Sequence, residues 1–218
     1  MVSAGQLSPS PPPIRKPPVK QGLAALVAVI LGSVYAVEGG YVNDPKDRGG
    51  ETNYGVTKRV AIDAGWKGPS MRTFPKHCSE GQPVCADSIY FKQYIEKPGF
   101  VPVVMVDPAV GEELVDSAVN MGPKWPSLWF QQSLNELAGA KVAVDGSVSV
   151  SDVSAYVFFQ QQVGSKTACL AMLDRLDAKQ WARYQGIVQA NPSQAKFLKG
   201  WKNNRIDNVN RKKCEGPL

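Results

Sequence analysis

The sequence predicts a mainly α fold with one small β-hairpin. Apolar residues recur at the three- and four-residue spacing of amphipathic helices, as in residues 108–121 and 167–189, and runs with the alternation of strands are few. The turn-rich stretch 38–57 is the exception, because its glycine pairs and its Asp-Pro step favour a chain that doubles back as one or two short hairpins. At 218 residues the chain can bury one good core and a second, smaller lobe.

The chain begins with a Pro/Ser-rich segment, residues 1–20, that carries three basic and no acidic side chains. Such a composition cannot form a core, so we expect a disordered or extended tail. The uncharged residues 21–37 follow, and as a helix they would span roughly 26 Å, which is short for crossing a bilayer. Three interpretations compete: a cleaved signal peptide ending at Ala36, a permanent membrane anchor, or the first helix of the folded domain.

Two carboxylates within the turn-rich stretch are the candidate catalytic groups. Glu38 ends the apolar helical run, and Asp47 follows after eight intervening residues. Hydrolysis of a glycosidic bond needs such a pair, because one carboxyl group protonates the leaving oxygen while the other activates water or attacks the sugar. We expect burial to raise the pKa of Glu38, and Lys46 and Arg48 to keep Asp47 ionised. An ordinary solvated turn with surface acids is the alternative.

The stretch resembles the signature of glycoside hydrolase family 108, whose members are lysozyme-like muramidases. The matching residues read Glu38-Gly-Gly-Tyr41, then Pro45-Lys-Asp47, then Gly49-Gly-Glu-Thr52-Asn-Tyr54-Gly-Val-Thr57. A second matching block is 116–123, Asp-Ser-Ala-Val-Asn-Met-Gly-Pro. The Glu-to-Asp spacing is also similar to that of phage-type lysozymes, although four residues instead of five separate Asp47 from Thr52. The resemblance extends from about Gly22 to the C-terminus and is nearest to signal-anchor-release endolysins of short-tailed phages that infect Gram-negative bacteria.

The resemblance implies a lysozyme-like helical domain with the hairpin beside a substrate cleft. It implies that Glu38 is the general acid and that Asp47 positions or activates water or stabilises the transition state. Thr52 is a third candidate catalytic residue, and Tyr41 and Tyr54 are candidate contacts to the substrate.

The resemblance also selects among the interpretations of residues 21–37. Cleavage after Ala36 would remove the helix that must hold Glu38, and a catalytic acid needs rigid support. In signal-anchor-release endolysins this segment enters the bilayer as a weak, uncleaved anchor and later becomes the helix that carries the catalytic Glu. We therefore expect the protein first at the host inner membrane and then in the periplasm.

The chain contains four cysteines, which allow three pairings. In an exported protein Cys78–Cys85 is the simplest bridge, with Cys169–Cys214 tying the C-terminal tail to a helix. A metal site at His77, Cys78 and Cys85 lacks a fourth ligand and the usual spacing, so we expect no metal. His77 is the single histidine, which excludes zinc peptidases that use several.

Beyond residue 56 the pattern predicts mostly helices, with a short extended link at 102–107 and a solvated tail at 211–213. The expected helices cover 56–66, 87–96, 108–121, 127–137, 151–163, 167–189 and 197–209. Asn120, near the end of one of them, either faces the cleft and binds a sugar amide or caps the helix. The aromatic residues of the last helices are expected to pack in the core and not to bind sugar; they are Trp181, Tyr184, Phe197 and Trp201.

We therefore divide the chain into a tail (1–20), an anchor and first helix (21–37), a catalytic domain (38–123) and a helical C-terminal lobe (124–218) similar to a peptidoglycan-binding domain. The predicted protein is a monomeric phage endolysin without a cofactor, hydrolysing the β-1,4 bond between N-acetylmuramic acid and N-acetylglucosamine of peptidoglycan. The net charge of +6 lies mostly at the two ends of the chain, but no nucleic-acid-binding module accompanies it. The alternatives are a lytic transglycosylase and a membrane-anchored, non-catalytic wall-binding protein.

Overall fold

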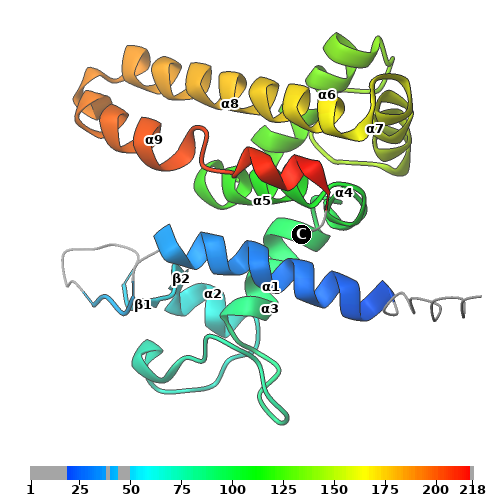
Figure 1. Cartoon of the computed structure of the whole chain (residues 1–218). Coiled ribbons are helices and arrows are strands. Elements are labelled where there is room, and N and C mark those ends of the chain that lie inside the picture. Colours follow the sequence, from blue (N-terminus) through cyan, green and yellow to red (C-terminus); the bar gives the residue numbers. More distant parts are fainter. Residues whose placement is uncertain (1–18, 38–39, 44–49, 217–218) are drawn as a thin grey trace, which may run out of the picture.

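The structure is a computed structural model that describes residues 19–37, 40–43 and 50–216. The predicted mainly helical class with a small hairpin is confirmed (Figure 1). In chain order the elements are α1 Val19–Val37, β1 Thr52–Asn53, β2 Val56–Thr57, α2 Lys58–Asp63, η1 Met71–Thr73, α3 Ala86–Tyr90, η2 Phe91–Glu96, α4 Val101–Val106, α5 Pro108–Met121, α6 Lys124–Ala138, α7 Val150–Val163, α8 Ser165–Ala190, η3 Pro192–Phe197, α9 Leu198–Arg205 and η4 Arg211–Glu215.

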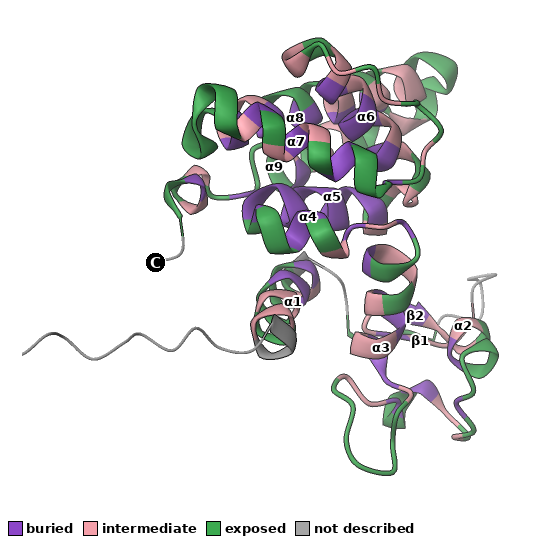
Figure 2. Cartoon of the chain, turned by 90° about the vertical axis from the view of Figure 1, so that its right-hand side faces the viewer, coloured by how far each residue is buried: buried purple, intermediate pink, exposed green. Residues whose placement is uncertain are grey.

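Helices α4 and α5 form the centre of the molecule. Figure 2 shows them between α1 with the hairpin region on one side and α6–α9 on the other, with α5 mostly buried. Both contact α1, and α5 also packs on α6 and α8. The core is therefore continuous from the first helix to the C-terminal lobe.

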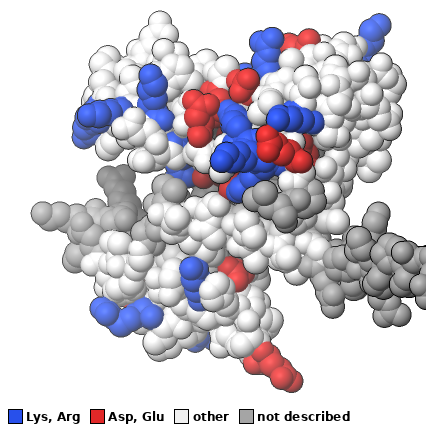
Figure 3. Space-filling model, viewed as in Figure 1, with Lys and Arg blue, Asp and Glu red and all other residues white. Residues whose placement is uncertain are grey.

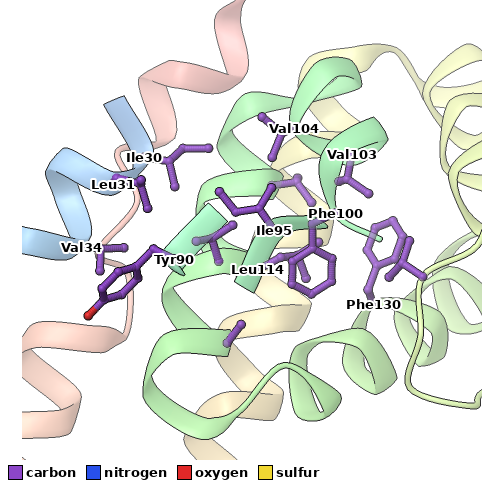
Figure 4. Packing of buried hydrophobic residues seen from close by; sticks show 14 of the residues in the cluster. Ile30, Leu31, Val34, Tyr90, Ile95, Phe100, Val103, Val104, Leu114 and Phe130 are labelled. Atoms are coloured by element: carbon purple, nitrogen blue, oxygen red, sulfur yellow. The ribbon is translucent and has the colours of Figure 1, made fainter. Parts of the chain in front are cut away.

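Helix α1 is half-buried, and one side of it belongs to the core. Ile30, Leu31 and Val34 are almost completely buried, and Figure 4 shows them beside Tyr90 and close to the core residues of the central helices. On the opposite side Val29 is 59% exposed. Residues 21–37 therefore lie in a helix that contributes one face to the core.

In the part of the chain that the structure describes, no helix combines the length and the apolar content that a bilayer span requires. Gly22, Gly32 and Ser33 dilute the apolar run of α1.

Two expectations from the pattern are wrong. Residues 102–107 were expected to be extended, but α4 covers Val101–Val106 because Pro102 lies in its first turn, where proline is tolerated, and Val103 and Val104 are fully buried. Residues 211–213 were expected to be a solvated tail but form η4, where Arg211 is paired with Asp177.

Other boundaries differ by a few residues. Helix α7 begins at Val150 and not at Ser151, because Ser149 and Asp152 form a capping box. The last basic helix, expected over 197–209, is divided into η3 and a short α9 that ends at Arg205. The expected helix over 56–66 begins with the strand β2 and continues as α2.

The two disulfides join Cys78 to Cys85 and Cys169 to Cys214, the simplest of the pairings that the spacing allowed. The first closes a short exposed loop before α3, and the second fastens η4 to α8. Since Cys78 and Cys85 are bonded to each other, they are not available as metal ligands beside His77, which instead contacts Asp87 at 2.8 Å.

Candidate active site

The two predicted catalytic carboxylates, Glu38 and Asp47, lie outside the described residues. The residues that flank them in the chain are described. Glu38 directly follows α1, and the segment that contains Asp47 joins Asn43 to Gly50 at the edge of the hairpin.

A cluster of tyrosines fixes the C-terminal end of α1. The Tyr35 hydroxyl donates to Asp87 Oδ1 at 2.8 Å, and burial raises the Tyr35 pKa far above its ordinary value, so this hydroxyl stays protonated. The Tyr35 ring meets the edges of Tyr90 and Tyr54, with centroids 5.4 and 6.4 Å apart. Together with buried Val34, these contacts hold the last turn of α1, which precedes Glu38, against α3 and the hairpin.

Backbone pairing at the hairpin joins Val42 and Thr52, the residues on either side of the segment that contains Asp47. Val42 and Thr52 exchange two backbone hydrogen bonds of 2.9 Å, so the chain closes a loop over residues 43–51. Thr52 then pairs with Thr57 in the antiparallel β1–β2 ladder. The Thr52 hydroxyl donates to the Gly50 carbonyl at 3.2 Å, which turns the side chain toward the base of the same loop.

Tyr54 occupies a strained position at the tip of the hairpin. Its φ of 50° and the 73° of Gly55 correspond to the two-residue turn that suits the twist of a hairpin. A non-glycine residue in this left-handed region costs about 1–2 kcal/mol. The turn is held by the Tyr90 hydroxyl, which donates to the Tyr54 carbonyl at 3.1 Å, and by the contact of the Tyr54 ring with Tyr35. Retained strain of this kind is typical of functional sites.

Glu51 is a further carboxylate of this site, and the sequence analysis did not single it out. It accepts hydrogen bonds from the Ser70 and Tyr41 hydroxyls, and its other oxygen lies 3.2 Å from Lys58 Nζ. The hydroxyl of Ser70, followed by those other donors, lowers the Glu51 pKa to about 2. Glu51 therefore stays ionised near neutral pH and holds Tyr41 in place, while the Arg72 guanidinium covers the Tyr41 ring at 4.4 Å.

Four of the predicted site residues are described by the structure, which brings three of them together and places Asn120 elsewhere. Tyr41, Thr52 and Tyr54 all belong to the hairpin region beside the end of α1. Asn120 lies in the last turn of α5, where its Oδ1 accepts a 2.6 Å hydrogen bond from Tyr184 of the C-terminal lobe. It is not the residue that ends the helix, because Gly122, with φ of 85°, takes that position.

A cavity of about 650 Å³ lies close to Asn120, between η2, the end of α5 and the start of α6. Tyr94, Lys97 and Lys124 line it together with the turn at Asp145. Tyr94 also packs on Tyr90, with ring centroids 5.4 Å apart, so the aromatic cluster at the end of α1 continues to this cavity.

Comparisons with known proteins match the two parts of the chain separately. The family model described as glycosyl hydrolase 108 matches residues 31–122, and the model described as a predicted peptidoglycan domain matches residues 125–206. Among solved structures, that of Brucella abortus SagA is similar, with a TM-score of 0.58 and 23% identity over 88% of this chain and 95% of that chain. At this identity the likeness shows the fold. The search of curated proteins found no match.

Proposed function

We propose, from the premise that this chain is a family 108 glycoside hydrolase followed by a peptidoglycan domain, that it is an N-acetylmuramidase. It would cleave the β-1,4 bond between N-acetylmuramic acid and N-acetylglucosamine. The observation that carries the proposal is the family match over residues 31–122, which includes the end of α1 and the hairpin motif.

Glu38 is the proposed general acid. Its position directly after a helix whose last turns are fixed by Val34 and Tyr35 supports this role, because proton donation to a leaving oxygen needs a carboxyl group held in one place. Asp47, on the loop that the Val42–Thr52 pair closes, is proposed to activate water or to stabilise the positive charge that develops on the sugar.

The hairpin residues are proposed to shape the cleft. Tyr54 is presented at the hairpin tip beside Tyr35, and Tyr41 is held by Glu51, so both rings have fixed supports. Thr52 is proposed to orient water or sugar. Its hydroxyl donates to Gly50 but retains lone pairs with which to accept a hydrogen bond.

Sacculus digestion tests these roles. The wild-type protein should release new reducing ends from purified Gram-negative sacculi, and Glu38→Gln should abolish the release while preserving the circular dichroism spectrum. Asp47→Asn should reduce it strongly. Glu80→Gln, a change at an exposed loop carboxylate, is the matched control and should have no effect. If folded Glu38→Gln retains full activity, the assigned acid is wrong.

A lytic transglycosylase is the alternative, because it acts on the same bond with a single acid and forms a cyclised sugar in place of a hydrolysed one. Mass spectrometry of the released fragments distinguishes the two. Hydrolysis yields reducing muramic acid ends, whereas anhydro ends would contradict the proposed muramidase.

We further propose that the protein acts outside the cytoplasm as a phage lysis enzyme. The two disulfides support export, since cytosolic thiols are kept reduced. The burial of Ile30, Leu31 and Val34 supports retention of α1, because cleavage after Ala36 would remove them from the core. N-terminal sequencing of periplasmic protein should find α1 intact, and a product starting at Val37 would contradict retention. Two further points stay predictions. One is that residues 21–37 first contact the inner membrane, and the other is that the protein is a monomer.

A further inference from the structure

Two aromatic side chains of the C-terminal lobe form an exposed, anchored surface. Phe197 ends η3 and Trp201 lies four residues later in α9, so both project from the same side, with ring centroids 5.9 Å apart. Phe197 is 45% exposed, so the expectation that it belongs to the core is wrong. Trp201 is half-buried and stacks on buried Tyr184 at 4.7 Å with ring planes only 14° apart. The stacking on Tyr184 thus holds Trp201 in place, while Phe197 stays accessible to solvent.

Three lysines belong to the same short segment as these rings. Lys196, Lys199 and Lys202 are exposed, and none has a carboxylate partner among the described residues. The Lys196 ammonium lies 5.0 Å from the Phe197 ring centroid, and residues 178–206 contain no Asp or Glu. Figure 3 shows Lys and Arg side chains at the left-hand edge of the upper half of the molecule, over the region that α9 occupies in Figure 1. An uncompensated positive surface of this kind attracts anionic polymers.

The surface is connected rigidly to the catalytic half of the chain. Tyr184, on which Trp201 stacks, donates to Asn120 at the end of α5, and Arg205 at the end of α9 pairs with buried Asp116 at 2.7 Å. In Figure 1 α9 lies at the same end of the molecule as the C-terminal end of α1, which precedes Glu38. A polymer held on α9 would therefore lie at the end of the molecule where α1 ends.

We infer that the Phe197–Trp201 surface, with its three lysines, binds a glycan strand of peptidoglycan. This inference rests on the proposed function and locates the site within the matched peptidoglycan domain. The apolar C–H face of a pyranose ring fits a flat aromatic ring, and the carboxylates of the stem peptides complement Lys196, Lys199 and Lys202. A neutral polysaccharide could pack on the aromatic rings but would offer no carboxylate to pair with the lysines.

Binding to purified sacculi tests the inference in the Glu38→Gln background, which prevents digestion during the measurement. Phe197→Ala should weaken binding about tenfold, the equivalent of about 1.4 kcal/mol. Replacement of the three lysines by Gln should weaken it at low salt and flatten its dependence on salt concentration. Phe158→Ala, which truncates a 57% exposed ring on α7, and Lys141→Gln are the matched controls and should bind normally.

Two outcomes would overturn the inference. One is unchanged sacculus binding by both folded variants. The other is loss of binding to phosphatidylglycerol vesicles with sacculus binding retained, which would identify a membrane-binding surface instead. Failure of the proposed function is separately visible, because it would appear as the absence of fragment release by the wild-type enzyme, whatever the binding results.

Discussion

The Cys169–Cys214 disulfide provides a quantitative test of how the C-terminal segment is held. It joins buried Cys169 of α8 to η4 across a sequence separation of 45 residues. Closing a loop of that length in the unfolded chain corresponds to about 4 kcal/mol of stabilisation in the chain-entropy relation. The Cys78–Cys85 loop, with a separation of 7, corresponds to about 2.4 kcal/mol in the same relation. We therefore expect loss of the long-range bond to be the more damaging.

Paired alanine variants at each disulfide isolate the two contributions. For a chain of this size each kcal/mol moves the melting temperature by about 2–4 °C, so the Cys169/Cys214 variant should melt about 8–16 °C below the native protein. The Cys78/Cys85 variant should melt about 5–10 °C below it. Thermal melts under non-reducing conditions measure both melting temperatures. Adding a reductant should then lower the melting temperature of each variant only by the contribution of the disulfide that it still contains.

The order of the two melting temperatures decides the matter. If the Cys169/Cys214 variant is no less stable than the Cys78/Cys85 variant, loop closure does not explain how η4 is held. The ion pairs of η4, Arg211 with Asp177 and Lys213 with Glu112, would then be the dominant attachments.

Three further outcomes are expected from buried or strongly bonded charges. Asp116→Ala removes the partner of buried Arg205 and should lower the free energy of unfolding by about 3–5 kcal/mol, as measured by urea unfolding. Burial raises the Glu113 pKa well above its ordinary 4.5, so the free energy of unfolding should fall as the pH rises above 4.5. Glu113→Gln should make the melting temperature less dependent on pH in this range, which thermal melts at several pH values measure. The hydrogen bonds from Ser70 and other donors lower the Glu51 pKa to about 2. The contribution of Glu51 to the free energy of unfolding should therefore be complete above pH 4.5 and be lost as the pH falls toward 2. Glu51→Gln should accordingly destabilise the protein least at the acidic end of this range.

Elements with clear periodicity and clear ends could be predicted from the sequence. Helix α5 has the predicted bounds, since its apolar spacing is regular and Gly122-Pro123 ends it. Helix α4 could not be predicted, because a six-residue apolar run fits an extended link as well as a helix. The burial of Val103 and Val104 decides in favour of the helix, and that burial depends on neighbours far along the chain.

The same limit applies to the site. The Glu38 and Asp47 motif could be proposed because candidate catalytic residue types and turn signals lie in one short stretch, and the roles of both residues stay predictions. The ionised state of Glu51 could not, because it depends on Ser70, which is 19 residues away and whose approach follows from the path of the intervening loop. The exposure of Phe197 was missed for a related reason, since helical spacing shows which residues share a face but not whether another element covers it.

Helix α5 connects the region matched to the hydrolase with the region matched to the peptidoglycan domain. Glu112, Asp116 and Asn120 are spaced by four residues and so lie on one side of α5. Each is bonded to the C-terminal part of the chain; the partners are Lys213, then Arg205 with Asn208, then Tyr184. Since α5 also packs on α1, a continuous series of contacts extends from the Trp201 ring to the helix that precedes Glu38. Removing the C-terminal lobe would remove the cations that are paired with Glu112 and Asp116, so residues 31–122 depend on that lobe for their own stability.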